Sequence, residues 1–161
     1  MNKPVITKNV AAKTITVERA FAAPRTRVWE AWTKSELLEQ WWAPKPWKAV
    51  TKSFSFVEGG HWHYYMLGPD GSKQYCWEGY ETITPEERFT MSNGFCDEQG
   101  VRDESMPLMH WNIEFVSVDE TAKVNATIQF DSAEDMEKII TLGFEEGFFF
   151  FFCNLDEVLA A

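Results

Sequence analysis

Two histidines in the middle of the chain have the residue type and spacing of metal ligands. His61 and His63 are two residues apart, and on a strand this spacing places both imidazole rings on the same face. Trp62, Tyr64 and Met66 alternate with them, and we assign these large apolar side chains to the inner face of a sheet. No cysteine or third histidine lies nearby in the sequence to complete a zinc site. We therefore expect both histidines on a solvated outer face, and no metal.

Glu81 is the candidate for acid–base chemistry. If its strand turns it inward beside Trp77 and Gly79, burial would raise the pKa of its carboxyl and allow it to donate or accept a proton. Tyr80 competes with it for the inward position, so the register of this strand stays open. Arg19 lies on the apolar side of the first strand, where we expect an edge salt bridge.

Sequence motifs of common enzyme classes are absent. The chain has no GxSxG nucleophile elbow, no P-loop, no GxGxxG fingerprint and no plausible Cys–His pair. Its three cysteines are odd in number and lack CxxC spacing, which favours reduced thiols over a disulfide framework (Cys76, Cys96 and Cys153). We expect a protein without catalytic residues and without a cofactor.

Charge and hydropathy exclude several classes of partner. The 161 residues carry a net charge of −10, and 16% of them are aromatic. Residues 1–52 hold ten Lys and Arg against four Asp and Glu, so the remainder is strongly acidic. Such a chain is a poor binder of phosphate backbones, and no apolar run approaches the roughly 20 residues of a membrane span. We expect a cytoplasmic protein that binds no nucleic acid.

Alternating patterns position these residues on a sheet. Residues 1–12 are expected to form a flexible tail, and residues 13–161 a single domain. A strand from Lys13 is followed by two short helices, which begin near Pro24 and Ser35. About six strands then lie between residues 47 and 130, separated by turns such as Gly68-Pro69-Asp70-Gly71.

After Ser132 the hydrophobic period changes from two to 3.6 and predicts one long C-terminal helix. The expected fold is α+β, with an antiparallel sheet of about six or seven strands curved around that helix. Large side chains meet between sheet and helix, and they either fill the space or line a pocket for a small hydrophobic or aromatic ligand. The candidate ligand-binding residues are Trp62, Tyr64, Met66, Trp77, Trp111, Phe144, Phe148, Phe151 and Phe152.

Ordered short motifs resemble those of a known family. They run from Phe21-Ala-Ala-Pro24 through Trp41-Trp42-Ala-Pro44 and Glu58-Gly59-Gly60 to Glu145-Glu146-Gly147. Together they resemble the homologues of the activator of the heat-shock-protein-90 ATPase, within the START-like, birch-pollen-allergen-like superfamily. The resemblance implies a helix-grip fold with a hydrophobic cavity. It also implies three alternative functions: binding of a small apolar ligand, a co-chaperone-like interaction, or cyclase or hydrolase chemistry on a hydrophobic substrate.

One segment departs from that resemblance. Phe148 to Phe152 form a run of five phenylalanines, where the family usually mixes small, polar and apolar residues. Five consecutive residues cover every side of a helix, so the sheet cannot bury all of them. Phe148, Phe151 and Phe152 continue the buried stripe, whereas Phe149 and Phe150 point elsewhere. We expect the latter two to contact a second copy of the chain; the alternatives are that a loop covers them or that the run fills the cavity.

Overall fold

A computed structural model describes residues 3–160, which form eight strands and four helices. In chain order these are β1 (Val5–Asn9), β2 (Thr14–Phe21), α1 (Arg25–Thr33), α2 (Ser35–Trp41), β3 (Lys48–Ser55), β4 (His61–Leu67), β5 (Lys73–Thr84), β6 (Arg88–Phe95), β7 (Met109–Val118), β8 (Thr121–Phe130), α3 (Ala133–Thr141) and α4 (Phe144–Ala160). All strands belong to one antiparallel sheet of order β1-β2-β8-β7-β6-β5-β4-β3.

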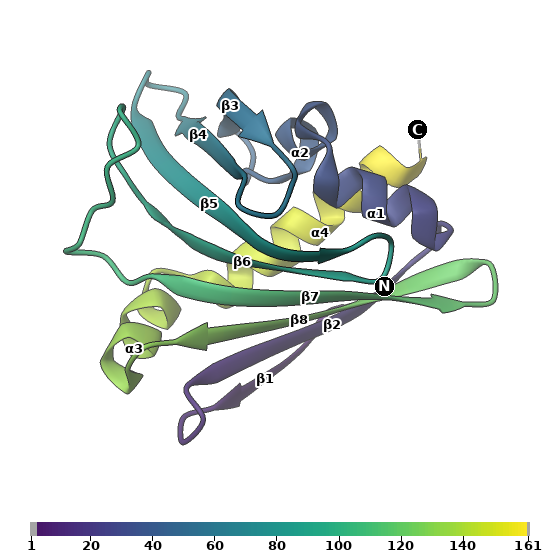
Figure 1. Ribbon diagram of the computed structural model, residues 1–161. Coiled ribbons are helices and arrows are strands. Elements are labelled where there is room, and N and C mark those ends of the chain that lie inside the picture. The colour runs from purple at the N-terminus through teal and green to yellow at the C-terminus, as the bar shows by residue number, and fades with distance from the viewer. Residues whose placement is uncertain (1–2, 161) are drawn as a thin grey trace.

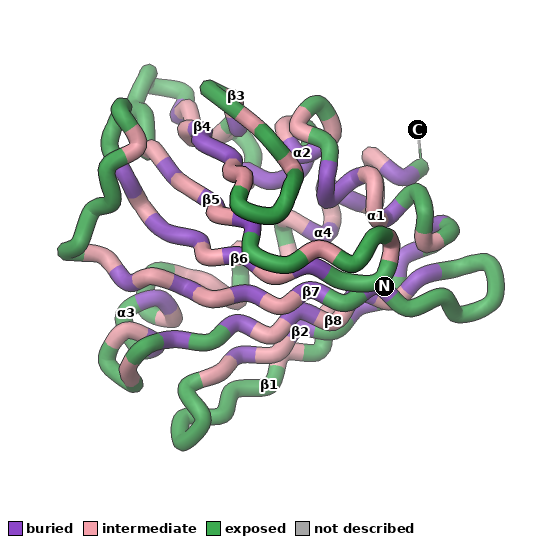
Figure 2. The backbone as a smooth tube through the Cα atoms, in the orientation of Figure 1, coloured by how far each residue is buried: buried purple, intermediate pink, exposed green. Residues whose placement is uncertain are grey.

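The sheet curves around α4, as the alternating pattern predicted. Figure 1 shows the strands bending over the yellow C-terminal helix, with α1 and α2 at one end and α3 at the other. Every second residue is buried along β8 and along β7 as far as Phe115, and Figure 2 shows this alternation as changes of colour along the tubes. The expected α+β helix-grip architecture is therefore confirmed, although the sheet has eight strands rather than six or seven.

The additional strand lies in the segment that we expected to be a flexible tail. Val5–Asn9 pairs antiparallel with β2, with Ile6 opposite Val17. Ile6 is partly buried against the core, whereas the rest of β1 is exposed. One apolar contact in five residues is too weak a pattern to predict a strand, and the expectation of a tail is wrong for this segment.

The expected single long helix is broken into α3 and α4. Gly143 has φ +91°, a left-handed conformation that glycine adopts without a Cβ clash, and its amide donates to the Ile140 carbonyl at 3.0 Å. The start of α3 matches its sequence signal, because the Ser132 hydroxyl accepts from the Asp135 amide at 3.1 Å. The apolar period continues through the break, so periodicity alone did not reveal it.

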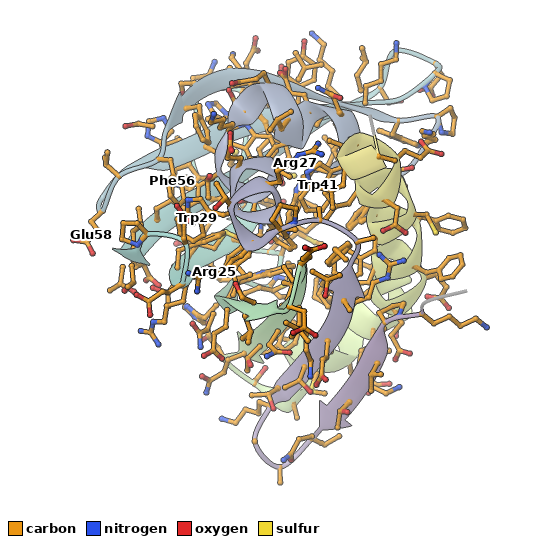
Figure 3. All side chains as sticks on the ribbon, turned by 90° about the vertical axis from the view of Figure 1, so that its right-hand side faces the viewer. Arg25, Arg27, Trp29, Trp41, Phe56 and Glu58 are labelled. Carbon is orange, nitrogen blue, oxygen red and sulfur yellow. The ribbon has the colours of Figure 1, made fainter. Side chains whose placement is uncertain are left out.

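Aromatic rings fill the end of the interior nearest α1. Trp29 packs edge-to-face on Phe56 at 5.8 Å between ring centroids, and Figure 3 shows the two side chains together. Trp29 also contacts Phe89 of β6 and Phe115 of β7. The opposite ends of these two strands lie near α3, and there the interior is not filled.

Candidate functional site

A cavity of about 300 Å³ lies between the sheet and the junction of α3 with α4. Phe144, Gly147 and Phe151 contribute one wall from successive turns of α4. Trp42, just after α2, forms a second wall and stacks on Phe151 with 5.8 Å between centroids and an interplanar angle of 16°. Trp111 of β7 forms the wall on the side of the sheet, and its ring centroid lies 5.9 Å from that of Trp42.

The cavity lining is apolar apart from the hydroxyl of Tyr64, the thiol of Cys76 and the amide of Asn93. None of its residues is charged: they are Trp42, Pro44, Tyr64, Met66, Cys76, Asn93, Gly94, Phe95, Met109, Trp111, Ile139, Leu142, Gly143, Phe144, Gly147 and Phe151. Small-molecule sites in proteins have this composition, with a few polar groups among hydrophobic walls, and their volumes begin at roughly 300 Å³.

The polar side chains of the cavity lead to a buried carboxyl group. The Trp42 indole N–H donates to the Tyr64 hydroxyl at 2.8 Å, and that hydroxyl donates to Glu78 Oε2 at 3.2 Å. The Asn93 amide donates to the same oxygen at 3.3 Å. Glu78 is only 3% exposed and lies directly behind Tyr64 and Asn93.

Burial changes the ionisation of this cluster. It raises the pKa of the Glu78 carboxyl from 4.5 to about 8, and the two hydrogen bonds that Glu78 accepts offset this only in part. Burial also raises the pKa of the Cys76 thiol to about 12 and raises the pKa of the Tyr64 hydroxyl. At neutral pH most molecules therefore carry an uncharged cluster behind the cavity wall.

Known protein families and solved structures that are similar to this chain support this architecture. The family model of the Activator of Hsp90 ATPase homolog 1-like proteins matches residues 22–160. The chain belongs to this family.

Solved structures resemble this member of the Hsp90-activator-homologue family over nearly its full length. A protein from Arthrobacter aurescens is 31% identical with a TM-score of 0.91, over 97% of this chain and 91% of the other. A protein from Staphylococcus epidermidis is 28% identical with a TM-score of 0.86, over 97% and 93%. A third, from Mycobacterium smegmatis, is 25% identical with a TM-score of 0.88, over 96% and 95%. No functionally curated protein matches the chain. Family and fold support a ligand-binding or co-chaperone-like module.

The structure divides the predicted ligand-binding residues of this family member into three groups. Those that line the cavity are Tyr64, Met66, Trp111, Phe144 and Phe151. Trp62, Phe148 and Phe152 are fully buried and fill the core beside the cavity instead. Trp77 is outside both, because its strand presents it to the outer face of the sheet, where it stacks on His61 at 4.5 Å.

The register of β5 corrects the expectation for Trp77 and decides between Tyr80 and Glu81, which the sequence left open. Cys76, Glu78 and Tyr80 are the buried inward residues, and Trp77 alternates with them. Glu81, the carboxylate that we considered for acid–base chemistry, is exposed and accepts a hydrogen bond from the Ser92 hydroxyl at 3.2 Å. The inward carboxyl is Glu78, which the sequence analysis did not single out, although an inward Tyr80 places Glu78 on the same face of the strand.

The two histidines do not share an environment. His61 is half-buried on the outer face, whereas His63 is 6% exposed and its imidazole lies 3.2 Å from the Asp97 carbonyl. Within residues 3–160, no three His, Cys, Asp or Glu side chains are grouped as metal ligands. Over the same residues, no helix is both long and apolar enough to cross a membrane.

Proposed function

We propose that this protein binds a small hydrophobic or aromatic ligand in the cavity between the sheet and α4. The observation that carries the proposal is the unfilled space of about 300 Å³ with aromatic walls and no charged lining residue. Burial of apolar ligand surface there would contribute roughly 25 cal/mol per Å², before the cost of association. The preformed walls favour affinity, because Trp42, Tyr64 and Trp111 are already held in the core.

Gly147 offers a direct test of this proposal. It lies inside α4 and lines the cavity, and a Cβ there would meet only ring atoms of Phe151 at 3.9 Å, an ordinary contact. Gly147→Leu is expected to fill part of the cavity and to weaken binding of the neutral fluorescent probe N-phenyl-1-naphthylamine at least tenfold. The measurement is a fluorescence titration of the purified protein.

Gly147→Ala is the matched control. Alanine is expected to retain the probe with less than a threefold change in Kd. It should also raise the free energy of unfolding by up to about 1 kcal/mol, because Gly is a poor residue for a helix interior. Equal probe binding by the wild type and Gly147→Leu would place the probe elsewhere, and no binding to the wild type would contradict the proposed function.

We also propose that Phe149 and Phe150 contact a second copy of the chain. Phe150 is 56% exposed and is the only exposed aromatic side chain of residues 3–160; Phe149 packs edge-to-face on it at 5.7 Å. Exposed large apolar side chains often mark an interface, and here exposed Phe150 is extended by half-buried Phe149. Light scattering after gel filtration is expected to give a dimer at 200 µM and a monomer for the double variant F149S/F150S. A monomeric wild type at that concentration would contradict the proposal.

A further inference from the structure

Glu78 is a buried carboxyl group without a cationic partner. None of the ion pairs within residues 3–160 involves it. Its side chain accepts hydrogen bonds from the Tyr64 hydroxyl and the Asn93 amide, both of which donate to Oε2. Buried carboxylates are normally paired with a cation or bound to a metal, so this group lacks the partner that its charged form requires.

Among residues 3–160, none of the groups that interact with Glu78 supplies that charge. From β4 it meets Tyr64, from its own strand Cys76 and Tyr80, and from β6 Asn93. Burial raises the pKa of Tyr64, Cys76 and Tyr80, so all three are neutral at pH 7. Trp42, which donates to Tyr64, is also uncharged. Without a positive charge nearby, the buried Glu78 carboxyl is therefore more stable with a proton bound than as a carboxylate.

The cavity in front of this group has walls that suit a cation. Trp42 and Trp111 both line it, and the face of an aromatic ring attracts a positive charge that comes within about 6 Å of the ring centroid. No Lys, Arg or His lines the cavity, so a ligand carboxylate or phosphate would be buried without a counter-charge. We therefore expect the cavity to bind cationic ligands more tightly than neutral ones, and anionic ligands most weakly.

We propose that the cavity selects an apolar ligand bearing a protonated amine, whose positive charge is balanced by the Glu78 carboxylate behind Tyr64 and Asn93. The proposal rests on the proposed function, because it assigns the ligand class of the same cavity. The ammonium group enters with its charge, Glu78 releases its proton to the solvent, and the net charge of the buried site stays at zero. The apolar remainder of the ligand lies against Phe144 and Phe151.

Three ligands with the same phenyl group test this selection. 2-Phenylethylamine is a cation at pH 7, 2-phenylethanol is neutral and phenylacetate is an anion. Isothermal titration of the wild type is expected to give a Kd for the amine at least tenfold below that of the alcohol, with phenylacetate the weakest. Titrations in buffers of different ionisation enthalpy are expected to show release of up to one proton per amine bound and none per alcohol.

Two variants assign the effect to one carboxyl group. Glu78→Gln is expected to reduce the ratio of amine to alcohol affinity at least fivefold, leaving only the preference that the aromatic walls supply, and to abolish the proton release. Glu81→Gln, a change of the exposed carboxylate on the same strand, is expected to keep both. Far-UV circular dichroism verifies that each variant is folded.

The outcomes separate this proposal from the proposed function. If 2-phenylethanol binds the wild type and loses affinity in Gly147→Leu, the cavity binds ligands. In that case, equal or tighter binding of the alcohol or of phenylacetate relative to the amine overturns the amine selection alone. An amine preference that is undiminished in Glu78→Gln also overturns it. Failure of all three ligands and of N-phenyl-1-naphthylamine to bind overturns both.

Discussion

A Glu78→Gln variant is expected to be more stable than the wild type at pH 8.5 and about equally stable at pH 4.5. Glu78 is 3% exposed, and burial raises the pKa of its carboxyl from 4.5 to about 8. A glutamine side chain at this position would be neutral at every pH, and its amide oxygen can still accept hydrogen bonds from Tyr64 and Asn93. The variant therefore removes the titration of the buried group and preserves its contacts.

The sign of the effect follows from where the proton is bound. Between pH 4.5 and about 8 the folded state holds a proton on Glu78 that the unfolded state has released. The contribution of this group to stability is complete below the unfolded pKa and is lost as the pH rises through the folded pKa. Over that window the loss is on the order of 4 kcal/mol, since one pKa unit corresponds to about 1.4 kcal/mol.

Urea unfolding of both proteins at pH 4.5, 7 and 8.5 measures the difference. The free energies of unfolding should diverge progressively as the pH rises, with the variant the more stable. Glu81→Gln is the control. Because Glu81 is exposed, the difference in free energy of unfolding between this variant and the wild type should stay the same from pH 4.5 to pH 8.5. Parallel curves for Glu78→Gln and the wild type would show that Glu78 does not titrate in this window.

The expected instability has a bearing on function. A carboxyl group that lowers stability at and above neutral pH is unfavourable for folding, and glutamine would serve the same hydrogen bonds. Strained or destabilising groups are concentrated at sites where their chemistry is used. The position of Glu78 directly behind two cavity residues therefore agrees with a ligand that supplies the missing positive charge.

The order of elements was predictable because most strands bury only one face. In β8, Val124, Ala126 and Ile128 are buried and alternate with half-buried Asn125 and Thr127, so the pattern has a single interpretation. The same holds for β7. Neither strand requires tertiary information beyond the curvature of the sheet.

The register of β5 could not be predicted in the same way. Both faces of this strand carry aromatic rings, with Tyr80 inside and Trp77 outside. The outer ring is covered by the loop after β6, since a Cβ at Gly100 would lie 3.0 Å from the Trp77 ring. A strand covered on both faces loses the contrast between apolar and polar positions, so the choice between Tyr80 and Glu81 as the inward residue stayed open.

The cavity itself depends on features that are distant in sequence. Trp42 stacks on Phe151, and the break at Gly143 sets where α4 begins against the sheet. The aromatic stripe of the helix predicted which rings face inward, but Phe148 and Phe152 fill the core whereas Phe144 and Phe151 border empty space. That difference follows from the path of α4 across the sheet, which no local pattern contains.

The second large effect is expected where α4 is attached to β2. The Arg19 guanidinium, with its side chain only 3% exposed, forms two hydrogen bonds of 2.7 and 2.6 Å with the Asp156 carboxylate. It also lies 4.7 Å from the ring centroid of Phe21 and 5.9 Å from that of Phe152. The sequence predicted an edge salt bridge for Arg19, but the cation is buried and only the carboxylate, 43% exposed, reaches the solvent.

This asymmetry predicts unequal effects for the two partners. Asp156→Ala is expected to lower the free energy of unfolding by about 3 kcal/mol, because it removes the carboxylate that compensates a buried cation. Arg19→Met is expected to cost less, since an apolar chain replaces the buried stem and Asp156 remains hydrated. Glu157→Ala is the control, because Glu157 lies next to Asp156 on α4 but forms an exposed ion pair with Lys45. Breaking that pair should lower the free energy of unfolding by about 0.5 kcal/mol or less. Urea unfolding at pH 7 compares the three variants, and a loss for Asp156→Ala no larger than that for Glu157→Ala would mean that the Arg19 charge is stabilised without its carboxylate partner.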